Sequence, residues 1–299
     1  MNTHAHHIPH NDAGRAFVIG IVFNSVFVVI EVAYGIFAHS LALLADAGHN
    51  ASDVLGLCMA WGATLLARRP SSDRFTYGLQ SASIYAALAN ALLLLVAVGG
   101  IGWEALERLS SPVAPAAGTV IVVAAIGVAV NGATAWLFHG GHHDLNRRGA
   151  YLHMLGDAGI SLGVVLSGVL FIYTGWLWLD PVLSLAIVFF IIQSSWRLLK
   201  ESSSLALHAV PATIDVNTVR HYLAGFSGVD EVHDLHIWAM STTGVALSAH
   251  LIMPGGHPGD RFIHDVTHGL EEHFHISHAT LQIEVGDGIE HCHLTCEVS

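Results

Sequence analysis

Two histidine–aspartate pairs with one shared spacing stand out among the side chains that could do chemistry. His49 precedes Asp53 by four positions, and His153 precedes Asp157 by four. Residues four apart lie on one face of an α-helix, one turn from each other. Two such faces brought together would supply two imidazoles and two carboxylates, a tetrahedral ligand set that suits Zn²⁺ and also Co²⁺ and other borderline divalent metals. The spacing therefore predicts one metal site shared by two helices.

The apolar surroundings of the two pairs help to distinguish a metal site from a simple buried hydrogen bond. A single His–Asp pair is as often a buried hydrogen bond that only orients two helices as it is part of a metal site. Both pairs lie in long apolar stretches, where charged side chains are costly and usually mark ion or substrate pathways. Asp46, about one turn before His49, is either an acceptor or proton relay behind the ligands or a helix-end residue near the lipid headgroups. Glu31 is a further carboxylate in an apolar stretch and a candidate pathway residue.

A second kind of cluster closes the sequence. Its potential ligands are His291, Cys292, His293 and Cys296. Thiolates and imidazoles this close together are typical of zinc or copper(I) sites, and a reducing cytosol would keep the thiols free. The chain has only 3 cysteines, too few for a disulfide framework. We therefore predict a metal-binding tail over residues 289–299.

The composition excludes several classes of protein. Hydrophobic residues make up 53% of the 299 residues and charged residues 11%, against about 25% charged residues in an ordinary soluble domain. A wholly soluble enzyme and a disordered protein are thereby excluded. With 11 Lys and Arg against 23 Asp and Glu, the net charge is -12, so there is no basic patch for a nucleic acid. The chain is a polytopic membrane protein with an acidic soluble part.

The elements that must position the ligands are transmembrane helices. Six apolar stretches are each long enough to cross a bilayer, for which roughly 20 residues suffice: 16–37, 41–67, 79–107, 113–138, 149–175 and 177–199. They form a predicted membrane domain over 15–200, preceded by a histidine-rich disordered segment over 1–14. Lys and Arg gather in the loops on one side, which predicts that both termini are cytoplasmic.

The pattern changes after the sixth stretch. Residues 208–288 show helical spacing from Asp215, strands over 229–240 and 245–253, a helix after Pro258 and a strand over 279–285. The order helix–strand–strand–helix–strand predicts a small cytoplasmic α+β domain with its helices on one face of a sheet.

Four segments together resemble the cation diffusion facilitator family. They are Leu44-Ala45-Asp46-Ala47-Gly48-His49-Asn50-Ala51-Ser52-Asp53, Arg74-Phe75-Thr76-Tyr77-Gly78, His153-Met154-Leu155-Gly156-Asp157 and His233-Asp234-Leu235-His236-Ile237-Trp238. The resemblance covers about residues 13–288 and is strongest to the zinc/cobalt/cadmium exporters. It implies a homodimer, a six-helix transmembrane domain, a ferredoxin- or metallochaperone-like cytoplasmic domain, and metal/proton antiport by alternating access.

The resemblance also assigns residues. It carries the transport ligands over to the two His–Asp pairs, and the family's histidine at the position of His49 accompanies a preference for zinc over cadmium. In the cytoplasmic domain it implies a metal at the dimer interface, held by His233, His250 and Glu284. Gln282 stands where a further histidine often occurs. His236, separated from His233 by two residues, is expected on the same strand face, and His264 or His268 would complete a set.

The resulting prediction is a divalent-metal exporter of the bacterial inner membrane. Zinc is its expected cargo, with cobalt and cadmium, and also a structural ion of the cytoplasmic domain. Its partners are a second copy of the chain, protons and the lipid bilayer. An intramembrane metalloenzyme is disfavoured because the sequence has no His-Glu-x-x-His motif. The alternative is a metal sensor or storage protein that the membrane helices only anchor.

Overall fold

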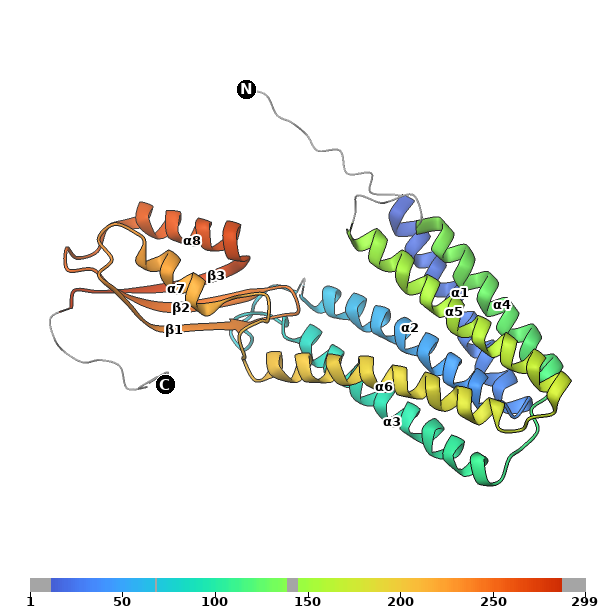
Figure 1. Cartoon of the computed structure of the whole chain (residues 1–299). Helices are drawn as coiled ribbons and strands as arrows, with labels where there is room; N and C mark the ends of the chain where they lie inside the picture. Colours follow the sequence, from blue (N-terminus) through green and yellow to red (C-terminus); the bar gives the residue numbers. More distant parts are fainter. Residues whose placement is uncertain (1–11, 68, 139–144, 287–299) are drawn as a thin grey trace. The chain divides into compact units, whose positions relative to one another are not determined.

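The computed structural model describes residues 12–67, 69–138 and 145–286. Six long helices come first, and three strands and two shorter helices follow (Figure 1). The long helices are α1 (Asp12–Phe37), α2 (Leu41–Ala67), α3 (Ala82–Ser110), α4 (Ala117–Phe138), α5 (Leu145–Thr174) and α6 (Leu179–Ala206). All six predicted helices are present, and the largest difference is the end of α6, which continues past the predicted residue 199 to Ala206.

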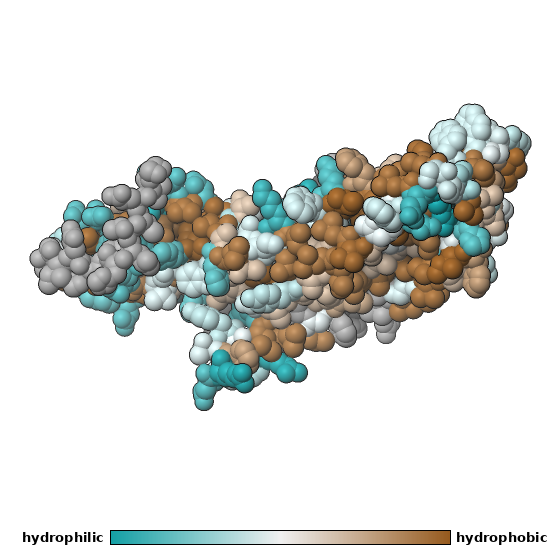
Figure 2. Space-filling view, turned by 90° about the horizontal axis from the view of Figure 1, so that it is seen from below, coloured by the Kyte–Doolittle hydropathy of each residue, from teal (hydrophilic) through white to brown (hydrophobic). Residues whose placement is uncertain are grey.

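Four of these helices are long and apolar enough to cross a membrane. They are α3, Ala117–Trp136 of α4, Tyr151–Thr174 of α5, and α6, while Val22–Phe37 of α1 is a shorter apolar segment. Among the residues that the structure describes, α2 does not reach this criterion. Large apolar side chains such as Phe37, Val96 and Phe189 are 70–78% exposed, and brown apolar residues cover much of the visible helical surface in Figure 2. Such a surface fits a lipid environment.

The chain divides into two compact units, one containing residues up to Cys58 and Ala89–Arg197, the other Met59–Leu88 and Leu198–Ser299. The first unit packs through small side chains. A Cβ on Gly168 of α5 would lie 2.8 Å from Cγ1 of Ile121 in α4, and a Cβ on Gly127 of α4 would lie 2.7 Å from the Phe27 ring of α1. These glycines let the helix backbones approach closely, as is common in membrane bundles.

One carboxylate fixes the start of α2, the helix that carries His49. Asp180, the second residue of α6, accepts hydrogen bonds from the Ser40 hydroxyl at 2.5 Å and from the Leu41 backbone N–H at 2.7 Å. It thereby satisfies donors that the first turn of a helix leaves free. From the sequence, Asp180 is only part of the polar break before the sixth helix, whereas in the structure it joins the starts of α2 and α6.

The second unit contains the predicted α+β domain. It consists of α7 (Val216–Ala224), β1 (Glu231–Ala239), β2 (Val245–Ile252), α8 (Asp260–Phe274) and β3 (Ile276–Glu284). The strand order is β1-β2-β3, with β1 and β2 antiparallel and β2 and β3 parallel. Both helices cover one face of the sheet (Figure 1), and Val219, Leu247 and Leu270 are fully buried in the core between them. The predicted order of elements and the one-sided helical layer are confirmed.

Candidate metal sites

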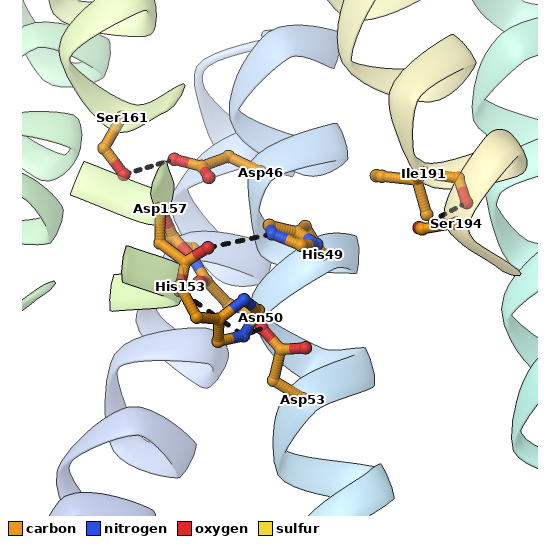
Figure 3. Close-up of polar contacts among 10 residues, drawn as sticks. Asp46, His49, Asn50, Asp53, His153, Asp157, Ser161, Ile191 and Ser194 are labelled. Carbon is orange, nitrogen blue, oxygen red and sulfur yellow. Dashed lines mark hydrogen bonds and ion pairs between the residues drawn. The ribbon is translucent and has the colours of Figure 1, made fainter. Parts of the chain in front are cut away.

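The two predicted His–Asp pairs meet between α2 and α5 (Figure 3). His49 Nε2 lies 2.9 Å from Asp157 Oδ1, and His153 Nε2 lies 3.1 Å from Asp53 Oδ2 and 3.8 Å from Asp157 Oδ2. The shortest contacts therefore cross from one helix to the other. One ligand atom each of His49, Asp53 and Asp157 lies within 4.8 Å of the others. His153 completes the group, with its ring centroid 6.0 Å from that of His49.

The charges of this cluster leave room for a cation. Within the described part of the chain, the groups paired with Asp53 and Asp157 are histidines, which are charged only when protonated. The Oδ2 atoms of Asp53 and Asp157 are buried, and the partner described for both is the His153 ring. Buried carboxylates need a compensating charge. Two imidazoles and two carboxylates at these distances are a ligand set that a divalent metal can bind.

One candidate ligand of this cluster is exposed and another is buried. The His153 side chain is 46% exposed, whereas that of Asp157 is 3% exposed.

Behind the ligands, Asp46 is fully buried. It accepts a hydrogen bond of 2.8 Å from the Ser161 hydroxyl of α5. Ser161 was not identified from the sequence, although it lies four residues after Asp157 and therefore on the ligand-bearing face of α5.

A second cluster lies on the sheet, with one ligand from each strand. His233 Nε2 of β1 lies 3.0 Å from Glu284 Oε2 of β3, and His250 Nδ1 of β2 lies 2.9 Å from Glu284 Oε1. His250 alternates with the buried Ala249 and Leu251 along β2, so its side chain lies on the face opposite the helices. These three residues form the other described group of ligand atoms that lie within 4.8 Å of one another. His264 and His268, expected as further ligands, instead stack on each other in α8.

The protonation state of Glu284 suits a metal ligand. Partial burial alone would raise the pKa of its carboxyl, but hydrogen bonds with His233 and Gln282 and the charges of His233 and His250 lower it overall. Gln282, found in place of a histidine, donates from Nε2 to Glu284 Oε1 at 2.8 Å. This hydrogen bond therefore helps to fix the orientation of the Glu284 carboxylate.

Asp234 connects His236 to this cluster. Residues three apart in a regular strand point to opposite faces, so a regular strand would not give His236 and His233 the shared face that was expected. The register of β1 against β2 shifts between them, and Asp234 has a left-handed backbone with φ 47°. The Asp234 carboxylate then lies 3.0 Å from His236 Nε2 and 3.4 Å from His250 Nε2.

The predicted tail site lies outside the described residues. His291, Cys292, His293 and Cys296 belong to residues 287–299, and the N-terminal histidines belong to residues 1–11.

Comparisons with known proteins cover nearly the whole chain. The family model for the cation efflux transmembrane domain matches residues 17–205, and that for the cytoplasmic domain of cation efflux proteins matches residues 211–285. The zinc transporter ZitB of Escherichia coli (strain K12) is 34% identical over 289 residues, which cover 95% of this chain and 92% of the relative. The cadmium, cobalt and zinc/H(+)-K(+) antiporter of Bacillus subtilis (strain 168) is 33% identical over 283 residues, covering 92% and 91%. The metal cation efflux system protein CzcD of Cupriavidus metallidurans is 32% identical over 284 residues, covering 94% and 90%. The chain belongs to the cation efflux proteins, the cation diffusion facilitator family.

Proposed function

We propose that this protein exports Zn²⁺, and with it Co²⁺ and Cd²⁺, across the bacterial inner membrane in exchange for protons. The observation that carries the proposal is the meeting of His49, Asp53, His153 and Asp157 between α2 and α5. The relatives support the cargo and the exchange, since their names describe zinc transport, cation efflux and antiport with protons. These names are those of transporters, which favours transport over catalysis.

The ligand set favours borderline metals over hard ones. Zn²⁺ is commonly held by four ligands that include imidazole nitrogens and carboxylate oxygens. Mg²⁺ and Ca²⁺ prefer six or more oxygen ligands. The two histidines therefore select against the abundant hard cations.

The same ligands supply a means of coupling to protons. A histidine binds metal only in its neutral form, so metal and protons compete for the site. His is also the side chain that ordinarily titrates closest to neutral pH. Protonation of the cluster from the outer side of the membrane would then expel the metal, and its deprotonation on the cytoplasmic side would allow the next ion to bind.

The proposal includes the arrangement of the chain in the membrane. In the proposed topology α1 to α6 all cross the bilayer, and both termini and the α+β domain lie in the cytoplasm. The protein acts as a homodimer, which the match to a dimer-forming cytoplasmic family domain supports.

A resident zinc ion in the cytoplasmic domain fits the residues present. His250 Nδ1 is buried and faces Glu284 Oε1 at 2.9 Å, and the lowered pKa of Glu284 keeps its carboxylate ionised. His233, His250 and Glu284 would hold this ion. Its role would be to join the three strands and to stabilise the dimer.

Zinc uptake into proteoliposomes under an imposed pH gradient tests the transport function. The wild type should accumulate zinc only while the gradient lasts, and Asp157→Ala should abolish uptake. Glu104→Gln is the matched control, because Glu104 is an exposed carboxylate of α3 paired with Arg108. Uptake that survives in Asp157→Ala would exclude the α2–α5 cluster as the transport site. Zinc that binds to the wild type but never crosses would favour a sensor or storage protein.

A further inference from the structure

Beside the proposed transport site lies a second pair of acidic side chains that are not among its ligands. Glu31 of α1 and Asp46 of α2 are both fully buried. Each has a donor on one of its two oxygens. Asn50 Nδ2 donates to Glu31 Oε2 at 2.9 Å, and Ser161 Oγ donates to Asp46 Oδ2 at 2.8 Å.

The remaining two oxygens have no donor. Glu31 Oε1 and Asp46 Oδ1 are buried and unpartnered among the described residues. The two carboxyl groups are neighbours, because Asn50, the donor to Glu31, lies one helical turn after Asp46 on the same face of α2. A buried polar atom without a partner is costly and rare. Two adjacent buried carboxylates also repel each other strongly, which is why such pairs commonly share a proton.

We propose that Glu31 and Asp46 form a proton-binding site, separate from the metal ligands, in which one proton is shared between Glu31 Oε1 and Asp46 Oδ1. A single O–H bond on either oxygen gives both unpartnered atoms a hydrogen bond. It also removes one of the two buried charges. A metal ion explains the pair less well, because two carboxylates alone do not complete the coordination of a divalent ion.

The neighbouring helices supply few other charges. His49 of α2 and Asp157 of α5 are the titratable groups of those helices that act on Asp46. The helix α4, which packs against α1, contains no titratable residue. Asn50 and Ser161 are neutral donors. The proton is therefore the nearest available compensation for the second carboxylate.

The pair is connected to the metal ligands through short stretches of helix. Asp46 lies three positions before His49, Asn50 follows His49 directly, and Ser161 lies four positions after Asp157. A divalent ion bound by the ligands would thus be about one helical turn, roughly 5 Å, from the carboxyl pair. Its charge favours loss of the shared proton, which passes to water as the O–H bond breaks.

This inference rests on the proposed function, and it adds a second source of exchanged protons. Metal binding would release a proton from the Glu31–Asp46 pair in addition to any released by the ligands. When the metal leaves, the pair would take up a proton again.

The test counts the protons released per zinc bound by the full chain in detergent, in weakly buffered solution with a pH indicator. Glu31→Gln keeps the shape of a protonated Glu31, with an amide that can donate to Asp46. We expect it to bind the same amount of zinc as the wild type but to release about one proton fewer per ion, as expected for removal of one coupled proton site. Asp46→Asn should do the same, and the control Glu104→Gln should match the wild type. Equal release by Glu31→Gln and wild type at equal zinc binding would overturn the proposal.

Infrared spectroscopy of the wild type provides a measurement that needs no variant to fold. The metal-free chain should show a band of a protonated carboxyl group that disappears when zinc is added, and absence of that band would overturn the proposal. Where Glu31→Gln folds, it should lack the band. A wild type that shows the band but moves no zinc in proteoliposomes would contradict the transport function and leave the shared proton in place.

Discussion

Asp234 is the residue whose contribution to the cytoplasmic cluster was least evident from the sequence. Its carboxylate contacts Nε2 of His250 at 3.4 Å, while Nδ1 of the same ring faces Glu284 at 2.9 Å. A carboxylate on one ring nitrogen fixes the tautomer and leaves the other nitrogen free to bind metal.

Replacing Asp234 should therefore weaken zinc binding to the cytoplasmic cluster. Asp234→Gly accommodates the left-handed backbone at φ 47° and removes the acceptor, and we expect about a 10- to 100-fold loss of affinity. Asp234→Asn keeps a neutral acceptor and should lose less. Competition with a zinc chelator, in a background in which Asp157→Ala disables the proposed transport site, measures the affinity. Unchanged affinity in Asp234→Gly would show that Asp234 does not orient His250.

The sequence predicts the candidate ligands more readily than the residues that contact them. A spacing of four identified His49, Asp53, His153 and Asp157, because helical geometry alone places each pair on one face. Neither Ser161 nor the role of Asp180 was found in this way. Their contacts join helices 115 and 140 positions apart in sequence, and local periodicity carries no information about such distances.

Among the helices, α2 depends on a cap from another helix. Asp180 accepts from Ser40 and Leu41 and makes a longer contact with the Ala42 N–H at 3.4 Å, and all of these residues are buried. Asp180→Ala would leave buried donors unsatisfied, a cost of about 1–3 kcal/mol. We expect a lower unfolding temperature and faster hydrogen exchange in the first turn of α2. Ser40→Ala, which leaves the bond from the Leu41 N–H in place, should show a smaller change, and equal effects of the two variants would contradict the cap.

The hydrogen bonds at the start of α7 predict that the stability of this helix depends on pH. Hydrogen bonds from the Thr218 hydroxyl and the Asn217 N–H lower the pKa of the Asp215 carboxyl. Because its pKa is lower in the folded state, its ionisation stabilises the helix above the ordinary pKa of aspartate, about 3.9, and this stabilisation is lost as the pH falls through the lowered pKa. Compared with Asp215→Asn at each pH, the wild type should protect the α7 amides more at neutral pH. The difference should vanish on acidification, and a difference independent of pH would contradict this cause.

In the α+β domain, the strands and helices can be predicted from the sequence, but the irregularity within a strand cannot. Alternating apolar residues and turn signals placed all three strands and both helices, since these patterns are local. The irregularity in β1 between His233 and His236 was not predicted, because a bulge arises from pairing with β2. That irregularity brings Asp234 and His236 into the network of His250.

At the scale of the whole molecule, α1 and α2 are the helices whose path through the membrane does not follow from their apolar length alone. Neither helix satisfies the length and hydropathy criterion within the described residues. Yet Glu31 of α1 bonds Asn50 of α2, and His49 of α2 meets Asp157 of α5, an apolar helix that does satisfy it. A helix that turns its polar residues toward its neighbours need not be apolar all round to cross a bilayer.

Six crossings and four crossings predict different places for the turn between α1 and α2. We expect it on the outer face of the inner membrane, on the same side as the turn between α3 and α4. Phe37→Cys at the 78% exposed end of α1 and Ser111→Cys should both react with a membrane-impermeant maleimide in intact cells, in a background with the native cysteines replaced by serine. Ser72→Cys, in the connector between α2 and α3, should react only after the membrane is opened. Protection of Phe37→Cys together with reaction of Ser111→Cys would indicate that α1 and α2 do not cross, and the metal would then need a route to the α2–α5 cluster other than one through a six-helix bundle.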